Sequence, residues 1–475
     1  METDVAILGG GAAGLSAARE ARRQGATATI VNRGPLGGDC TFTGCVPSKT
    51  VIEAAKAGLG FTEAFTRARS VVAHIAATES ADRLREEGIE VIDDEGTLTA
   101  VGRAPALQVG TRTITAAGVV LALGSRPFVP PIPGLDRVRF LTTDSLWELD
   151  RAPATMVVIG GGPIGVELSQ ALARLGVGVT LVEMAPSILT REESAAVDLA
   201  TRALEGDGVT VLTGASVSQV EPAAGETAAA AASAATVVLA DGRRVVADRI
   251  LVAAGRQPNS HRGGLAEAGV ALDERGSVTN RDSLQTSVSG VYVAGDLAGR
   301  LQFTHAADHM GRIAAANIVS RFGRIRPQRF VAGHVPWVTF TDPEIARIGH
   351  TEAEAARLVP GAQVAELPLA EHDRALAADA IDGFIKIIAA PRPVLGMTGG
   401  GRIVGATIVS ERAGEMMAEI ALAVRLGAFT GRLAQSVHAY PTWSYGVAKA
   451  VGQFFTTIEG RTARPAREET VAVPG

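Results

Sequence analysis

The chain has 475 residues, of which 47% are hydrophobic, 20% charged and 4% aromatic, and its formal net charge is −5 at pH 7. This length indicates two or three domains, and the composition excludes disorder along the whole chain. The weak acidic balance excludes a basic surface for nucleic acid, and no apolar run is long enough to span a membrane. The start Met1-Glu2-Thr3-Asp4 lacks the basic character of a signal peptide, so we expect a cytoplasmic protein.

The first segment is predicted to form a strand, a glycine-rich turn, a helix and a second strand. An apolar run at 4–8 leads into Gly9-Gly10-Gly11-Ala12-Ala13-Gly14, helical periodicity follows over 12–24, and a second apolar run covers 28–31. A G-x-G-x-x-G turn in this context is typical of dinucleotide binding, because the helix N-terminus offers N–H groups to a pyrophosphate. Gly9, Gly11 and Gly14 are therefore predicted to bind a dinucleotide, and Asn32 to hydrogen-bond its ribose.

The two cysteines of the chain, Cys40 and Cys45, follow closely on this unit. A lone close pair in a cytosolic protein is more often catalytic or metal-binding than structural. A four-ligand zinc site would need further cysteine or histidine nearby, and none lies within twenty residues. Because residues five apart lie on different faces of an ideal helix, we expect Cys40 at a distorted helix start that makes the pair reactive, with Gly44 relieving the crowding.

The strand–turn–helix–strand pattern recurs about 150 residues later. An apolar run at 155–159 leads into Gly160-Gly161-Gly162-Pro163-Ile164-Gly165, a helix is expected to about Leu175, and a strand over 178–182. A second copy in the same context predicts a second dinucleotide site, formed by Gly160, Gly162 and Gly165.

The residue after this last strand bears on the choice of coenzyme. Glu183 is expected to take the ribose hydroxyls, and its carboxylate would repel a 2′-phosphate, which favours NADH over NADPH. Arg191 lies close enough in sequence to leave NADPH open.

The remainder of the chain carries further elements. The alanine-rich stretch 221–236 is predicted as a surface hairpin excursion, residues 286–296 as a loop and a buried strand, and residues 321–331 as a domain boundary. Strands and amphipathic helices then alternate, at 384–389, 403–409, 413–426 and 445–455.

Four motifs resemble those of the FAD-dependent pyridine nucleotide–disulfide oxidoreductases, which include dihydrolipoamide dehydrogenase, glutathione reductase and mercuric reductase. They are Gly37-Gly38-Asp39-Cys40-Thr41-Phe42-Thr43-Gly44-Cys45-Val46-Pro47-Ser48-Lys49, Ala122-Leu123-Gly124-Ser125-Arg126-Pro127, Ala254-Gly255-Arg256-Gln257-Pro258-Asn259 and Val293-Ala294-Gly295-Asp296. The resemblance covers residues 3–458 and is closest to the mercuric-reductase-like branch.

The resemblance implies an α/β fold with two Rossmann-like dinucleotide-binding domains and an α+β C-terminal dimerisation domain. The implied FAD-binding domain covers residues 1–147 with 277–331, and the implied NAD(P)-binding domain covers residues 148–276. An interface domain would follow at residues 332–458 and a flexible tail at residues 459–475. It also implies a homodimer in which each active site borrows residues from the partner.

The resemblance also assigns roles to residues. Cys45 would be the charge-transfer thiol against the flavin, Cys40 the interchange thiol facing the substrate, and Lys49 and Glu167 a pair near flavin N5. Gly96 would approach the FAD adenine, Asp296 would bind the ribitol or pyrophosphate region, and His305 and Ala306 would lie near the flavin. The other residues expected to bind cofactor are Gly38, Lys49, Gly124, Ser125, Gly255 and Gly295.

The chain departs from the family at the acid–base site. Disulfide-reducing members use His-Pro-Thr-x-x-Glu, whereas here Tyr440 stands at the histidine place and Tyr445 at the glutamate place. A tyrosine with a pKa near 10 is a poor base at neutral pH, though it can donate a proton, and His438 could substitute for the base. Mercuric reductases share the tyrosine but need a C-terminal cysteine pair that this sequence lacks. Efficient turnover of lipoamide or glutathione and efficient mercury reduction are therefore both disfavoured.

The leading hypothesis is a flavoprotein that passes electrons from NAD(P)H, with NAD(H) favoured, through FAD and the Cys40–Cys45 disulfide to a small disulfide or other thiol-reactive acceptor, or that runs the reverse dithiol oxidation. One alternative is an NAD(P)H:quinone reductase or diaphorase that uses the flavin directly. Others are a redox sensor, the flavoprotein subunit of a larger complex, and a two-Rossmann protein with structural cysteines. We expect no bound metal and no nucleic-acid or membrane partner.

Overall fold

The computed structural model describes residues 1–102, 104–222, 234–320, 323 and 325–468. The chain divides into two compact units. Unit 1 comprises residues 1–160, 174–178 and 217–332, and unit 2 comprises residues 161–173, 179–216 and 333–475. In the described part of the chain, no helix combines the length and the apolar character that crossing a membrane requires.

The main sheet of unit 1 is mixed and has seven strands. Its order is β3 (Ile89–Ile92), β2 (Ala28–Val31), β1 (Glu2–Leu8), β6 (Arg112–Leu121), β5 (Ala104–Val109) and β4 (Gly96–Val101), with β17 (Val291–Val293) paired to β6. The pairs of β1 with β2 and β6, of β2 with β3 and of β6 with β17 are parallel, whereas β4, β5 and β6 are antiparallel. Parallel strands joined through helices are the α/β arrangement that the sequence predicts.

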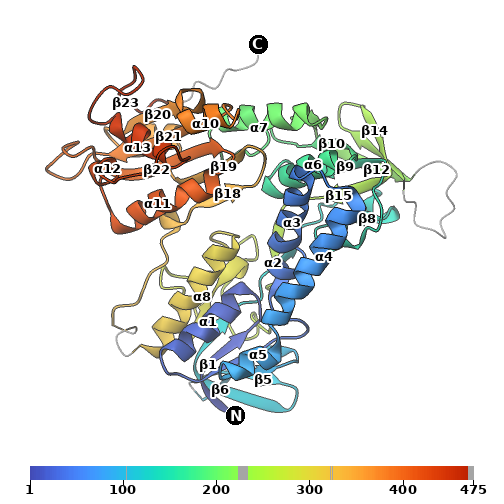
Figure 1. Ribbon diagram of the computed structural model, residues 1–475. Helices are drawn as coiled ribbons and strands as arrows, with labels where there is room; N and C mark the ends of the chain where they lie inside the picture. Colours follow the sequence, from blue (N-terminus) through green and yellow to red (C-terminus); the bar gives the residue numbers. More distant parts are fainter. Residues whose placement is uncertain (103, 223–233, 321–322, 324, 469–475) are drawn as a thin grey trace. The chain divides into compact units, whose positions relative to one another are not determined.

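Two helices of unit 1 pack closely on each other, α1 (Ala12–Arg23) and α8 (Thr304–Val319), as Figure 1 shows. The buried side of α1 is lined by small residues such as Ala13 and Ala17. A Cβ added to Gly311 of α8 would lie 2.2 Å from the carbonyl oxygen of Ala13, so only glycine allows this approach.

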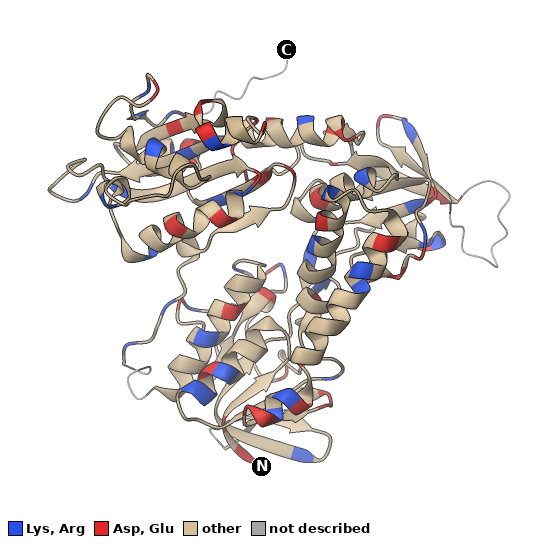
Figure 2. Ribbon diagram, viewed as in Figure 1, with Lys and Arg blue, Asp and Glu red and all other residues tan. Residues whose placement is uncertain are grey.

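A second group of helices in unit 1 follows the first strand pair. It consists of α2 (Gly38–Phe42), α3 (Cys45–Lys56), α4 (Phe61–Thr78) and α5 (Ala81–Glu86). α3 packs on α4, and the indole N–H of Trp147 donates to the carbonyl of Thr43 between α2 and α3 at 2.9 Å. α5 carries both acidic and basic residues, seen as red and blue stretches of its ribbon in Figure 2, and Arg83 pairs with Glu86 at 2.7 Å and Arg85 with Asp82 at 2.8 Å.

The other strands of unit 1 form smaller groups. β8 (Phe140–Leu141) and β9 (Thr155–Ile159) flank β15 (Arg249–Val252) in parallel, and β7 (Ser125–Pro127) pairs antiparallel with β16 (Arg256–Pro258). β12 (Val217–Pro222), β13 (Ala235–Leu239) and β14 (Arg244–Ala247) form an antiparallel meander. The predicted hairpin around the alanine-rich stretch is thus confirmed for its two strands, whereas residues 223–233 lie outside the described residues.

The largest sheet of unit 2 is antiparallel. Its order is β18 (Trp337–Thr339), β19 (Glu344–Gly349), β22 (Arg402–Ser410), β21 (Phe384–Ala390), β20 (Gln363–Pro368) and β23 (Arg464–Pro465). One face packs against α11 (Ala413–Leu426), α12 (Thr430–Ala434) and α13 (Tyr445–Gly452), and the other contacts α9 (Glu352–Leu358). The predicted helix 445–455 therefore ends three residues early, and residues 469–475 of the predicted tail lie outside the described residues.

The rest of unit 2 contains a parallel strand pair and the helices next to it. β10 (Gly178–Val182) pairs with β11 (Thr210–Leu212), α6 (Pro163–Arg174) precedes this pair, and α7 (Ser194–Gly206) connects its strands. A short helix, α10 (Asp373–Ala377), lies between β20 and β21 in the chain. The short 3-10 helices of the two units are at Leu135–Arg137, Leu146–Glu148, Gly295–Ala298, Ala332–His334 and Leu369–Glu371.

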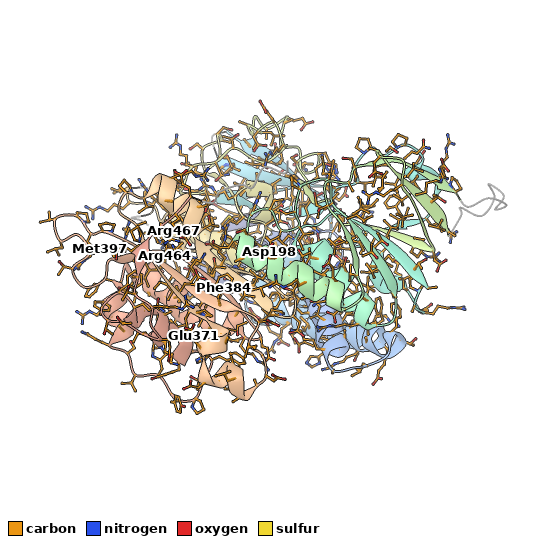
Figure 3. All side chains as sticks on the ribbon, turned by 90° about the horizontal axis from the view of Figure 1, so that it is seen from above. Asp198, Glu371, Phe384, Met397, Arg464 and Arg467 are labelled. Carbon is orange, nitrogen blue, oxygen red and sulfur yellow. The ribbon has the colours of Figure 1, made fainter. Side chains whose placement is uncertain are left out.

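Unit 2 also contains a buried ion cluster centred on Lys386 of β21, which is 6% exposed. Its ammonium nitrogen lies 2.9 Å from Glu352, 3.2 Å from Glu193 and 3.6 Å from Glu366. Arg464 of β23, labelled in Figure 3, pairs with Glu352 and lies 3.6 Å from Glu366. These contacts join α7, α9 and three strands of the sheet, so the cluster is part of the core of unit 2.

Candidate functional site

The first glycine-rich turn has the backbone shape of a phosphate cradle. Gly9 has φ +111°, and a Cβ there would lie 2.3 Å from the carbonyl oxygen of Ala122. A Cβ on Gly14 would lie 2.0 Å from the carbonyl oxygen of Gly9, so both positions require glycine. Gly11 occupies the N-cap of α1, and a Cβ there would meet only Gly38 among the described atoms within 4 Å. The helix N-terminus is therefore accessible to an anionic group.

The second glycine-rich turn repeats this geometry. Gly160 has φ +116°, and a Cβ there would lie 2.5 Å from the carbonyl oxygen of Ala253. Around Gly162, just before α6, no described atom lies within 4 Å of the place of a Cβ. Gly165 is buried in the first turn of α6. Both turns thus combine tightly packed glycines with one glycine that faces open space.

The two turns also share one side-chain contact. Asn32 accepts a hydrogen bond from the N–H of Gly10 at 2.8 Å, and Glu183 accepts one from the N–H of Gly161 at 2.5 Å, each across 22 positions of the chain. The other carboxylate oxygen of Glu183 accepts from the N–H of Ala185 at 2.7 Å. The predicted ribose-binding residues are therefore equivalent in place, and they differ in charge.

The cysteine segment is a helix interrupted at Gly44. Cys40 is the third residue of α2 and Cys45 is the first residue of α3. A Cβ on Gly44 would lie 2.9 Å from the carbonyl oxygen of Asp39 and 3.3 Å from the Cα of Cys40. Cys40 lies in the first turn of α2, which agrees with the expected helix start, and the distortion is a break between α2 and α3. The predicted role of Gly44 in relieving crowding is confirmed.

The two sulfurs lie against each other and against one hydroxyl. Both cysteines are thiols in the structure. The pKa of the Cys40 thiol is raised, because its side chain hydrogen-bonds that of Cys45, because it is buried, and because the charge of Cys45 disfavours a second one. The sulfur of Cys45 lies 3.3 Å from the hydroxyl of Thr304, the first residue of α8.

A polar network connects the other motifs with the cysteine segment. The hydroxyl of Ser125 donates to Asp296 at 2.5 Å, and the Nε–H of Arg256 donates to Ser125 at 2.7 Å. Another guanidinium N–H of Arg256 donates to Asp39, the residue before Cys40. Burial raises the pKa of Asp39, and the charge of Arg256 opposes this rise. Sequence reasoning missed the roles of Arg256 and Asp39, although both residues lie inside the motifs.

The remaining residues predicted to bind FAD lie in the same unit. Around Gly124 (φ +65°) and Gly255 (φ +118°) no described atom lies within 4 Å of the place of a Cβ. Gly38 packs on Gly11, a Cβ on Gly295 would meet Ala13 at 3.3 Å, Ala306 is buried, and His305 stacks on Phe303 with ring centroids 5.6 Å apart. A Cβ on Gly96 would lie 2.9 Å from Leu8 and from Val31, so packing within the sheet itself requires that glycine. The open glycines and the accessible start of α1 fit a dinucleotide cofactor such as FAD.

The predicted pair of Lys49 and Glu167 is distributed over the two units. Lys49 lies on α3 of unit 1, one turn beyond Cys45. Glu167 lies on α6 of unit 2, is 5% exposed, and accepts a hydrogen bond from the N–H of Phe340 at 2.8 Å. Contact between Lys49 and Glu167 stays a prediction.

The three candidates for the acid–base site differ in exposure. His438 is held by Glu419 at 2.8 Å, and its side chain is 8% exposed. Tyr440 is 65% exposed and packs edge-on against Tyr445, with ring centroids 5.4 Å apart. A hydrogen bond with Asp373 raises the pKa of Tyr440. Of the three, Tyr440 is therefore the most exposed to a second molecule, and it keeps its proton at neutral pH.

Comparisons with known proteins agree with this geometry. Residues 3–311 match the family described as pyridine nucleotide-disulphide oxidoreductase, and residues 335–451 match the dimerisation domain of that family. The chain is 33% identical over 467 residues to the mercuric reductase of Staphylococcus aureus, covering 95% of this chain and 82% of that protein. It is 30% identical over 460 residues to the dihydrolipoyl dehydrogenase of Geobacillus stearothermophilus, covering 93% and 94%. The Cu(II) complex of the HOCl-induced flavoprotein disulfide reductase RclA from Escherichia coli superposes with a TM-score of 0.83 at 25% identity, covering 95% of this chain and 99% of that one.

Proposed function

The chain belongs to the pyridine nucleotide-disulphide oxidoreductase family of FAD-dependent enzymes that use NAD(P)H, and from this premise we propose that it passes electrons from NADH to a small thiol-reactive acceptor through the Cys40–Cys45 couple. The contact of the two sulfurs, next to the start of α8, carries this proposal. The FAD domain of residues 1–147 with 277–331, the NAD(P) domain of residues 148–276 and the interface domain of residues 332–458 stay proposals.

In the proposed reaction, different residues hold the FAD, hold the coenzyme and attack the acceptor. Gly11, Gly38, Gly124 and Asp296 would hold FAD, which when bound supplies a two-electron relay between nicotinamide and disulfide. Gly162 and Glu183 would hold the coenzyme, and the carboxylate of Glu183 supports NADH, because it repels a 2′-phosphate. Cys40 would attack the acceptor, since it is the interchange thiol of the predicted pair.

The match to a dimerisation domain supports a homodimer. We propose that Tyr440 enters the active site of the partner subunit, where its hydroxyl donates a hydrogen bond or a proton to the leaving group. Its exposure and its hydrogen bond with Asp373 support this role. The ring of His438 is paired with the carboxylate of Glu419, as the ring of a general base can be, but its side chain is only 8% exposed, and this low exposure favours Tyr440 over His438.

A Cys40→Ser variant tests the thiol route. With a small aromatic disulfide as acceptor, turnover should fall by roughly a thousandfold or more, because the attacking nucleophile is lost. Ser70→Ala on the exposed side of α4 is a matched control and should keep full turnover. Full disulfide turnover in the Cys40→Ser variant would overturn the proposal.

A second function, an NADH:quinone reductase, is favoured by one observation. The acid–base place holds Tyr440 and Tyr445, and neither phenol is a base at neutral pH. An acceptor that takes electrons directly from the cofactor needs no such base. Full quinone turnover together with lost disulfide turnover in the Cys40→Ser variant would show that both routes exist, and an acceptor screen in which only quinones turn over would favour the second.

A further inference from the structure

Residues 440–445, which include the two tyrosines of the acid–base place, are anchored by another segment of unit 2. The ring of His372 is 1% exposed, and its Nε2–H donates to the carbonyl oxygen of Thr442 at 3.1 Å. Burial lowers the pKa of His372, so at neutral pH the ring is uncharged and carries its proton on this nitrogen. The guanidinium of Arg374 lies over the ring of Trp443, 5.6 Å from the ring centroid. Two residues of the anchored segment are therefore fixed in place.

Asp373, which lies between these two anchoring residues in the chain, contacts the phenol itself. Its carboxylate accepts a hydrogen bond from the hydroxyl of Tyr440, and this contact lowers the pKa of Asp373. The ring of Tyr440 is also supported edge-on by the ring of Tyr445. The ammonium nitrogen of Lys449 lies 3.5 Å from Asp373 and 3.0 Å from Glu459. The carboxylate that holds the phenol is thus itself held by a cation.

We propose that Asp373 is a positioning residue for Tyr440, because its carboxylate orients the phenol hydroxyl that donates a hydrogen bond to the sulfur leaving the acceptor. This inference rests on the proposed function, since it concerns the tyrosine that would serve the active site of the partner subunit. It adds the residue that holds the donor in place and the class of acceptor for which the donor matters. The resemblance assigned no role to Asp373.

The contact with a carboxylate favours the phenol over the phenolate for two reasons. The hydrogen bond exists only while Tyr440 keeps its proton, and a phenolate would place a second negative charge beside Asp373. Both effects raise the pKa of Tyr440, whereas the charge of Lys449 opposes them. Tyr440 therefore keeps its proton at neutral pH and has it available for a hydrogen bond.

The reduction of a disulfide creates the charge that needs this donor. The sulfur of Cys40 forms a bond with one sulfur of the acceptor, the S–S bond of the acceptor breaks, and its electron pair leaves with the other sulfur as a thiolate. Hydrogen bonds to charged groups are the strong ones, so a phenol hydroxyl stabilises this anion as it forms. The single proton of Tyr440 is held by Asp373 before this step and turns to the leaving sulfur as the negative charge develops there.

The need for the donor depends on the acceptor. A thiol of low pKa leaves readily as its thiolate, whereas an alkyl thiol leaves slowly. We therefore expect Tyr440 and Asp373 to matter little for disulfides of acidic aromatic thiols and to matter more for disulfides of alkyl thiols. This difference separates an effect on the leaving sulfur from a general loss of structure, which would slow reoxidation by both acceptors alike.

The test measures how fast each kind of disulfide reoxidises the FAD-loaded enzyme. Wild type and variants are reduced anaerobically with one equivalent of NADH, and the decay of the long-wavelength band between thiolate and flavin gives the rate. In Asp373→Asn, reoxidation by an alkyl disulfide should slow about tenfold, because an oriented hydrogen bond to a developing charge is lost. Reoxidation by an aromatic disulfide should slow less than about threefold.

Further variants show whether Asp373 acts through Tyr440. Tyr440→Phe removes the donor and should slow reoxidation by the alkyl disulfide at least as much as Asp373→Asn does. When Asp373→Asn is added to Tyr440→Phe, no further loss is expected, because no hydroxyl remains for the carboxylate to orient. Asp373→Glu keeps a carboxylate and should recover part of the loss. Asp382→Asn, which changes an exposed carboxylate further along the chain, is the matched control and should behave as wild type.

The outcomes separate this inference from the proposed function. Unchanged reoxidation of Asp373→Asn by the alkyl disulfide would overturn the role of Asp373, and so would an equal loss with both disulfides or a loss that persists in the Tyr440→Phe protein. The FAD content and the oligomeric state of each variant are measured, so that the rates compare intact enzymes. A reduced wild-type enzyme that neither disulfide reoxidises would overturn the disulfide route itself.

Discussion

At the scale of single residues, the chemistry of the candidate site depends on individual side-chain groups, and the residues after the two glycine-rich turns are an example. Glu183 and Asn32 occupy equivalent places in the two glycine-rich units, and each accepts a hydrogen bond from the turn. The carboxylate brings a charge that the amide lacks. If Glu183 holds the coenzyme as proposed, its charge would favour a coenzyme with free ribose hydroxyls, whereas Asn32 would make no such selection.

The Glu183→Gln variant should weaken the preference for NADH. Removing the charge takes away the repulsion of a 2′-phosphate and one strong ribose contact, so the ratio of kcat/KM for NADH over NADPH should fall about tenfold. Steady-state kinetics with both coenzymes and one acceptor measure this ratio. Glu205→Gln, an exposed change on α7, serves as the control. An unchanged ratio in Glu183→Gln would show that another residue, such as Arg191, selects the coenzyme.

At the scale of secondary-structure elements, the glycine-rich turns were predictable because their conformation is local. Gly9 and Gly160 need positive φ, and this requirement belongs to the strand–turn–helix segment itself, whereas the carbonyls that lie close to them belong to Ala122 and Ala253, which are distant in the chain. The break between α2 and α3 was only partly predictable. The five-residue spacing indicates a distortion, but it does not show that Cys45 begins a new helix.

Contacts between distant elements were not predictable from local patterns. Arg256 reaches Asp39 across 217 positions of the chain, and Thr304 reaches Cys45 across 259. In its local sequence, each of these residues looks like an ordinary polar residue. Their role depends on how the sheet and the helices bring the segments together, so only the folded unit reveals it.

The ion cluster centred on Lys386 of β21 is a further contact between segments that are distant in the chain. Its removal should destabilise unit 2. Lys386→Met leaves Glu193 and Glu352 buried without their shared cation, which should cost about 3–5 kcal/mol of unfolding free energy. Urea denaturation of the FAD-loaded protein at pH 7 measures it. Arg83→Met removes the exposed ion pair with Glu86 and should cost less than about 1 kcal/mol. Equal effects of the two substitutions would contradict the account.

The same cluster gives a direction for acid sensitivity. Burial alone would raise the pKa of Glu352, but hydrogen bonds from Arg464 and Lys386 lower it to about 2. A carboxyl whose folded pKa is lowered stabilises the protein above its unfolded value, and this stability is lost as the pH falls through the folded value. Wild type should therefore lose stability between about pH 4.5 and pH 2, and the Lys386→Met protein should lose less over that range.

At the scale of the whole molecule, the function depends on bringing two dinucleotide sites and one cysteine couple into a single electron path. Unit 1 holds the cysteines, the first glycine-rich turn and the Ser125–Asp296 network. Unit 2 holds Glu167, Glu183 and the exposed Tyr440. The match to a dimerisation domain supports a homodimer, and in the proposed function the path would be completed across the domains and across that homodimer.

Anaerobic titration of the wild-type holoenzyme with NADH tests the electron path most directly. The first equivalent should produce the long-wavelength band, because the electron pair comes to rest on Cys40 and Cys45, and the flavin absorbance should bleach only with the second equivalent. Bleaching of the flavin by the first equivalent, with no such band, would mean that the cysteine couple takes no electrons and would contradict the account.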